Sequence, residues 1–299
     1  MNITTVLIVA TALLAYGLFS NKIQGTSLTG PMLFAALGLL IGPTVFDLTQ
    51  MQITNAGLHV LAEITLVLVL FSDAASIDLK QLRRDHNLPL RMLVIGMPLT
   101  IILGTLAAFW LFPGFGVWEA ALLAAILAPT DAALGMSVVA DPVVPVRIRQ
   151  TLNVESGLND GIALPFVLVF AALASATADV PDQSYWVRFA LLQIALGPVA
   201  GIFVGYIGAR LVSKCYARQW MNESSEGAIA LALAFGAYAA GELIHGNGFI
   251  AAFVAGLTFG NTLQRKCEYL YEFAESEGMI LILLTFAAFG VVLLPEVIG

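Results

Sequence analysis

The stretch "NVESGLNDGIALP", residues 153 to 165, places several oxygen-bearing side chains close together on a predicted helix. Glu155 and Asn159 are four residues apart, and so are Ser156 and Asp160, so all four share one arc of that helix. Carboxylate, hydroxyl and amide oxygens suit Na⁺ or another hard cation, whereas zinc and copper favour His and Cys, which this stretch lacks. The stretch therefore predicts a site for a hard cation or a proton.

A second polar group stands at a predicted helix break in "LAPTDAALG", residues 127 to 135. Pro129 lacks a backbone donor and disfavours helical geometry at the residue before it. A break inside a membrane span frees backbone groups that only a water-lined or ion-filled cavity can satisfy. Thr130 and Asp131 lie beside this break, so we expect them in the same site. The alternative is a simple proline kink with Asp131 hydrogen-bonded to a neighbouring helix.

The rest of the chain has the composition of a membrane protein. Of its 299 residues, 59% are hydrophobic and only 11% are charged, and the mean hydropathy is +0.91. Helices of about 18 or more apolar residues can cross a hydrocarbon core of about 30 Å. We predict an all-α polytopic membrane protein with spans at residues 3–20, 28–46, 56–75, 89–112, 117–139, 150–174, 187–212, 224–243, 247–263 and 278–298.

The positive charges predict the orientation of these spans. All Lys and Arg residues except Arg188 fall in or beside loops that follow the first, third, fifth, seventh and ninth spans. Basic loops stay in the cytoplasm, so we expect an inner-membrane protein with its N-terminus outside. Asp131 and Asp160 then both lie about 15 Å from the inner surface, at one depth. A proton and a cation would compete for Asp160, which with alternating access amounts to exchange.

The second half of the sequence repeats a pattern of the first half. Without gaps, "GPMLFAALGLLIGP" (30–43) matches "GFIAAFVAGLTFGN" (248–261) at Gly30/Gly248, Gly38/Gly256, Leu39/Leu257 and Gly42/Gly260. The matched spans are seven apart, so the copies have opposite orientations, as in the inverted repeats of secondary transporters. We predict a first repeat at 1–174 that carries the ion site, a linker span and basic loop at 175–223, and an incomplete second repeat at 224–299.

The motifs "APTDAALG", "NVESGLNDGIALPF", "LFSDAASIDLKQLRR" and "GNGFIAAFVAGLTFGN" resemble the monovalent cation/proton antiporter family, the sodium/hydrogen exchangers of the NhaP kind. The resemblance covers essentially the whole chain. It implies an inverted-repeat sodium/proton antiporter fold with a broken fifth helix. It also implies Asp160 as the main carboxylate for cation and proton, with Thr130, Glu155 and Ser156 around a Na⁺ ion and Asp131 at the break.

The Asn159 and Asp160 pair bears on stoichiometry. In this family an Asn and Asp pair accompanies electroneutral exchange, whereas two aspartates accompany electrogenic exchange. With a neutral Asn159, one proton that leaves Asp160 is replaced by one Na⁺. The resemblance thus implies 1:1 exchange of Na⁺, or of Li⁺ or K⁺, for H⁺, and a homodimer.

This sequence also departs from the pattern of the family that it resembles. Family members usually carry twelve or thirteen helices, and their second half supplies another broken helix and an Arg that pairs with the acid at Glu155. This sequence has neither, so we expect a chain truncated after the tenth helix. Two alternatives stay open: a sodium-coupled solute transporter or channel on the same scaffold, and a non-transporting partial copy.

The remaining polar residues give a weaker indication of function. His59 and Glu63 are four residues apart in the third span and form either a structural pair or a proton relay. The sequence has no nucleic-acid footprint, no constellation of nucleophile and base, and no motif for a cofactor. We therefore expect a lipid-embedded protein that is not an enzyme, with Na⁺ and H⁺ as its substrates.

Overall fold

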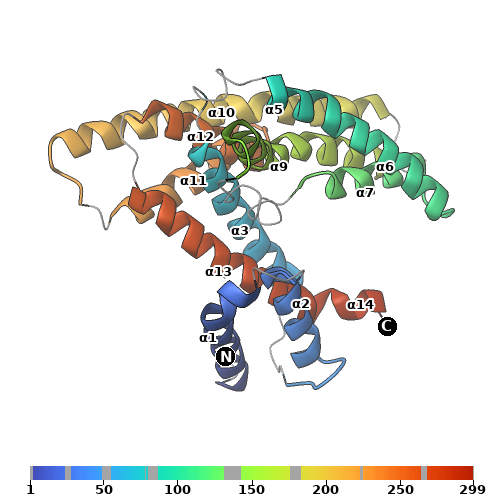
Figure 1. Ribbon diagram of the computed structural model, residues 1–299. Coiled ribbons are helices and arrows are strands. Elements are labelled where there is room, and N and C mark those ends of the chain that lie inside the picture. The colour runs from blue at the N-terminus through green and yellow to red at the C-terminus, as the bar shows by residue number, and fades with distance from the viewer. Residues whose placement is uncertain are drawn as a thin grey trace. The chain divides into compact units, whose positions relative to one another are not determined.

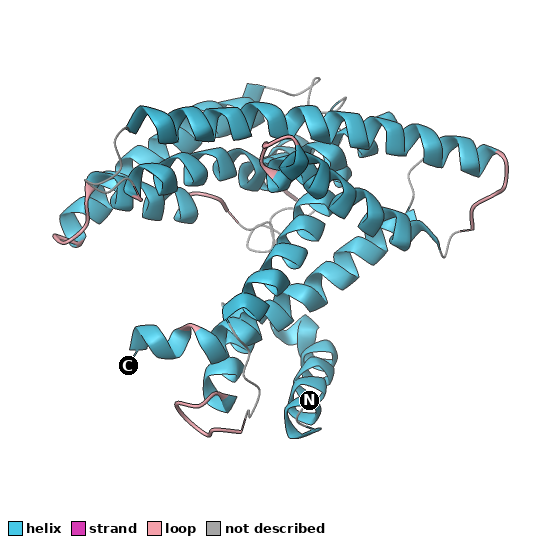
Figure 2. Cartoon of the chain, turned by 180° about the vertical axis from the view of Figure 1, so that it is seen from behind, coloured by secondary structure: helices cyan, strands magenta, loops and turns pink. Residues whose placement is uncertain are grey.

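A computed structural model describes residues 3–23, 28–48, 55–77, 79, 87–130, 143–175, 183–222, 225–263 and 268–298. Within these ranges the chain forms helices and connecting loops, and no strand (Figure 2). The contacts divide the chain into two compact units. Unit 1 comprises residues 1–69 and 272–299, and unit 2 comprises residues 70–271. Each unit is described by itself.

Figure 1 labels the helices in chain order. They are α1 (Ile3–Ile23), α2 (Gly30–Ile41), α3 (Asn55–Ser76), α5 (Asn87–Arg91), the π-helix η1 (Met92–Gly96), α6 (Met97–Leu111), α7 (Val117–Leu127), α9 (Val146–Ala174), α10 (Gln183–Ala217), α11 (Glu226–Leu243), α12 (Gly248–Thr262), α13 (Glu268–Val292) and α14 (Leu294–Ile298).

Each predicted span overlaps an apolar helical segment. Among the described residues, five segments are long and apolar enough to cross a membrane, and five shorter apolar helices correspond to the other spans. The predicted all-α polytopic architecture is confirmed. The predicted lengths were less accurate, since α2 has only 12 residues and α10 has 35.

Unit 1 is held by close packing of α2 against α13. A Cβ atom on Gly38 of α2 would collide with the carbonyl oxygen of Ala287, and one on Gly290 of α13 would collide with that of Ala35. Glycine at these positions lets the two backbones approach, as in other membrane helix pairs. The Thr65 and Thr285 hydroxyls add a 2.8 Å hydrogen bond between α3 and α13.

Unit 2 repeats this type of packing where α12 meets the end of α3. A Cβ atom on Gly256 would collide with the carbonyl oxygen of Phe71, and one on Gly260 with that of Ala75. Beyond the glycines, the Asn261 side chain joins the two helices. Its amide donates to the carbonyl of Ile77 at 2.8 Å, and its oxygen accepts from the backbone N–H of Leu79 at 2.8 Å.

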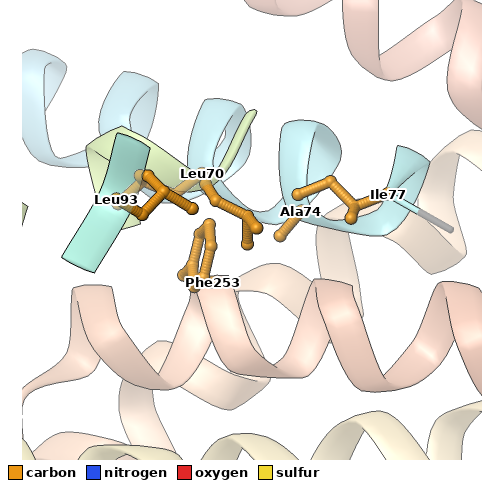
Figure 3. Packing of buried hydrophobic residues seen from close by; sticks show 6 residues of the cluster. Leu70, Ala74, Ile77, Leu93 and Phe253 are labelled. Atoms are coloured by element: carbon orange, nitrogen blue, oxygen red, sulfur yellow. The ribbon is translucent and has the colours of Figure 1, made fainter. Parts of the chain in front are cut away.

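The interior of unit 2 has two apolar clusters that hold α9. One joins α3, η1, α9 and α12 through Leu70, Ala74, Ile77, Leu93, Leu158 and Phe253 (Figure 3). The other joins α6, α7 and α9 through Met97, Ile101, Ala124, Ala125 and Ala163. Since α9 carries four of the six predicted ion-binding residues, Glu155, Ser156, Asn159 and Asp160, these clusters fix a helix on which the site depends.

Candidate functional site

The site begins where α7 ends. The last residue of the helix is Leu127, and Ala128, which keeps helical dihedral angles (φ −72°, ψ −37°), caps it before Pro129 and Thr130. The helix therefore ends directly before Pro129, which cannot donate a backbone hydrogen bond, whereas the expected loss of helical geometry at Ala128 does not occur. Residues 131–142, including Asp131, lie outside the described residues.

Thr130, Glu155 and Asn159 form a hydrogen-bonded cluster. The Thr130 hydroxyl donates to Glu155, at 3.2 Å from Oε2 and 3.5 Å from Oε1. Asn159 Nδ2 donates to the Thr130 hydroxyl at 2.9 Å and to the Thr130 carbonyl at 3.0 Å. Thr130 thus accepts from the amide and donates to the carboxylate, so one short segment after a helix break is tied to two successive turns of α9.

The orientation of the Asn159 amide follows from this chain of bonds. A carbonyl oxygen can only accept, so the NH₂ group of Asn159 must face Thr130. The amide oxygen is directed elsewhere, and none of the described groups donates to it. Asn159 is only 1% exposed, so this is a buried acceptor of the kind that calls for an explanation.

Asp160 follows Asn159 on α9, and its side chain is exposed. The side chain of Ser156 lies outside the described residues, so the predicted contribution of its hydroxyl, like that of Asp131, stays a prediction. The structure therefore brings together three of the six predicted residues, Thr130, Glu155 and Asn159, through bonds between described atoms.

A glycine next to Asp160 sets how closely α12 approaches α9. A Cβ atom on Gly161 would collide with the ring of Phe253, which packs in the cluster around Leu158. Sequence reasoning did not single out this pair. The only signal was a glycine directly after the Asn and Asp pair, and nothing local points to a partner almost a hundred residues later.

The other predicted pair lies in unit 1. His59 and Glu63 occupy one face of α3, and both side chains are exposed. Whether they form a structural pair or a proton relay stays a prediction.

The sequence matches the family described as "Sodium/hydrogen exchanger, transmembrane" over residues 8–299. It is 27% identical over 240 residues to Na(+)/H(+) antiporter 2 of Zygosaccharomyces rouxii. The aligned region covers 76% of this chain and 29% of that protein. It is 24% identical over 272 residues to the K(+)/H(+) antiporter NhaP of Alkalimonas amylolytica. This aligned region covers 89% of this chain and 45% of that protein.

A solved structure has the same fold. The sodium proton antiporter MjNhaP1 from Methanocaldococcus jannaschii superposes with a TM-score of 0.76 at 19% identity, over 95% of this chain and 69% of that one. The chain spans less than half the length of the two curated relatives. These relatives are named as transporters, in agreement with the expectation that this protein is not an enzyme. Because the family match extends over nearly the entire chain, the protein belongs to the transmembrane sodium/hydrogen exchanger family.

Proposed function

We propose that this protein exchanges a monovalent cation, Na⁺ or K⁺, for protons across a membrane. The observation that carries the proposal is the cluster of Thr130, Glu155 and Asn159 at the break after α7. Backbone groups freed within a membrane protein need polar partners, and here Asn159 serves one of them while a carboxylate stays close by. The names of the curated relatives include both Na(+)/H(+) and K(+)/H(+) antiporters, so either cation fits.

In this proposal, Asp160 is the carboxylate for which cation and proton compete. Glu155, Thr130 and Ser156 supply further oxygen ligands to Na⁺, and Asp131 lies at the break. Asn159 holds Thr130 in place with its NH₂ group and leaves its own oxygen as an acceptor. Since an amide carries no charge, one cation replaces one proton at Asp160, and exchange is electroneutral.

The predicted inverted repeat belongs to the same proposal, with boundaries at 1–174, 175–223 and 224–299. Gly38 of α2 packs on Ala287 of α13, and its counterpart Gly256 of α12 packs on Phe71 of α3. In each case the second helix of one copy packs on the third helix of the other copy. This reciprocal exchange of partners supports the repeat, because a two-fold relation between the copies requires it.

The orientation and assembly are also proposals. The distribution of Lys and Arg supports an N-terminus outside and basic loops in the cytoplasm of a cell whose inner membrane holds the protein. The family resemblance is the basis for proposing a homodimer.

Everted membrane vesicles that contain the 299-residue chain test the proposed exchange. A pH-sensitive dye is quenched by respiration, and NaCl, KCl or LiCl is then added. We expect dequenching with at least one cation, and we expect Asp160→Asn to abolish it. Unchanged membrane potential during the response, followed with a potential-sensitive dye, would support electroneutral exchange.

Asp47→Asn is the matched control for the loss of a carboxylate. Asp47 has a φ of 47° in the loop after α2, a conformation that Asn also tolerates. This variant should respond like the wild type. A correctly inserted wild-type chain with no response to any of the three cations would contradict exchange by this chain and favour a non-transporting partial copy.

A further inference from the structure

Unit 2 contains a groove that is separate from the proposed exchange site. It has a volume of about 780 Å³ and lies beside α5 and η1. The described residues that line it are Asn87, Leu88, Leu90, Arg91, Val94 and Ile95. They belong to the first nine residues of the candidate membrane span Asn87–Leu111.

The opposite face of the same segment is fixed to the protein. Pro89, Leu93 and Met97 are four residues apart and all are buried. Figure 3 shows Leu93 directed at the cluster that includes Leu70 and Phe253. Since one helix face is held by the core, the other must point outward, and Val94 and Ile95 are 66% and 60% exposed.

The groove changes from polar to apolar along the helix. Asn87 and Arg91 lie within the first five residues of the span, where a membrane helix passes through the headgroup region. Leu90, Val94 and Ile95 extend this wall into the span, with Ile95 about one helical turn deeper than Arg91. A groove with a charged end and an apolar side fits a molecule with a polar head and a hydrocarbon tail.

The charged end of the groove calls for a negative partner. In the described part of the chain, no carboxylate lies within ion-pair distance of Arg91, which is exposed. A guanidinium group binds phosphate oxygens in a bidentate manner. The sequence from Asp78 to Arg91 carries Lys80, Arg83, Arg84 and Arg91 against Asp78 and Asp85, a net charge of +2, which favours a lipid with net negative charge over a zwitterionic one.

The π-helix contributes to the shape of the groove. Residues Met92–Gly96 form η1 between the two α-helical parts of the span. A π-turn inserts one extra residue and shifts the rows of side chains on either side of it, and such turns are frequent at functional sites. Here the shift falls between Arg91 and the residues that follow it in the groove, Val94 and Ile95.

From these observations we propose that the groove binds an anionic phospholipid, with its phosphate at Arg91 and one acyl chain along Leu90, Val94 and Ile95. The site goes beyond the proposed exchange activity, since none of its residues belongs to the cluster of Thr130, Glu155 and Asn159. Its binding can therefore be measured without transport.

The test uses the purified 299-residue chain in detergent micelles. Dioleoyl phosphatidylglycerol and dioleoyl phosphatidylcholine are titrated, and bound lipid is counted by native mass spectrometry. We expect phosphatidylglycerol to bind the wild type about fivefold more tightly, and we expect Arg91→Gln to remove that preference. Arg218→Gln, at a residue that stacks on Trp220 outside the groove, is the matched control and should keep the preference.

A second variant tests the acyl part while Arg91 stays intact. Val94→Trp should fill the groove and weaken binding of phosphatidylglycerol severalfold, and it also serves if Arg91→Gln fails to fold. Equal binding of the two lipids by the wild type would overturn the proposal. So would an equal loss of preference in Arg218→Gln. Competition by inorganic phosphate, with no effect of Val94→Trp, would indicate a free-phosphate site instead of a lipid site.

Discussion

Thr130 occupies the central position of the candidate site, because its hydroxyl is both acceptor and donor. It receives a hydrogen bond from Asn159 Nδ2 at 2.9 Å and gives one to Glu155 Oε2 at 3.2 Å. Its backbone carbonyl takes the second hydrogen of the same amide at 3.0 Å. One residue after a helix break therefore sets the orientation of two polar side chains on another helix.

Removal of this hydroxyl should weaken cation binding. Thr130→Val keeps the shape of the side chain but leaves an amide hydrogen of Asn159 and the Glu155 carboxylate without their shared partner, which costs about 1–3 kcal/mol. We expect the cation concentration for half-maximal dequenching to rise about tenfold. Thr130→Ser, which restores the hydroxyl, should stay within about twofold of the wild type. If Thr130→Val and Thr130→Ser had the same half-maximal cation concentration, the hydroxyl would have no part in binding.

Much of this site could be predicted at the level of single residues. Spacing alone places Glu155 and Asn159 on one arc of α9, and Pro129 marks the break beside Thr130. The direction of the hydrogen bonds could not be predicted, because it depends on how a segment 25 residues away from Glu155 is placed against α9. The sequence suggested an ion ligand in Thr130, and the structure adds its bonds to Asn159.

At the scale of elements, the position of α9 depends on a ring that packs against a glycine. Gly161→Ala would place a methyl group against the ring of Phe253. Because the ring belongs to a side chain and can move only at the cost of its packing around Leu158, we expect α9 to shift and dequenching to fall severalfold. Phe253→Leu in the same chain should relieve the clash and recover part of the activity. If the double variant is no better than Gly161→Ala alone, the contact does not position α9.

The close packing of α12 on α3 should be much less tolerant. A side chain at Gly256 meets the backbone carbonyl of Phe71, which cannot rotate away. We expect Gly256→Leu to lower the melting temperature in detergent by several degrees or to prevent folding, because the helices must separate. Gly236→Ala in α11 is the control, since no atom lies within 4 Å of its added Cβ. That variant should be neutral or more stable by about 0.5–1 kcal/mol. A fully stable Gly256→Leu protein would contradict this account of the α3–α12 packing.

The number and approximate place of the apolar helices could be predicted, because long runs of apolar residues are a strong signal of helices in a membrane. Their ends and contacts were not. The prediction for α2 included residues 28–46, whereas the helix ends at Ile41, before Gly42 and Pro43. The π-turn at Met92–Gly96 has no signature in the sequence beyond a nearby proline, Pro98. Tertiary packing decides such features, and the packing partners are distant in the sequence.

For the whole molecule, the orientation follows from counting crossings. Gly114 lies in the loop after α6, and Cys215 lies near the end of α10. Three predicted spans, 117–139, 150–174 and 187–212, separate them, and since this number is odd we expect the two positions on opposite sides of the membrane. The basic residues around Cys215 predict that its side is the cytoplasmic one.

Cysteine labelling tests this orientation with two matched proteins. The first keeps Cys215 and carries Cys267→Ser, and the second combines Gly114→Cys with Cys215→Ser and Cys267→Ser. Gly114 is exposed, and nothing lies within 4 Å of an added Cβ, so the new thiol should be accessible. A membrane-impermeant maleimide added to intact spheroplasts should label the second protein at once and the first only after permeabilisation. In everted vesicles the order should reverse, because the cytoplasmic face is then outside. Labelling of both thiols from one side would require an even number of crossings between them, which would remove the basis for opposite orientations of the two repeats.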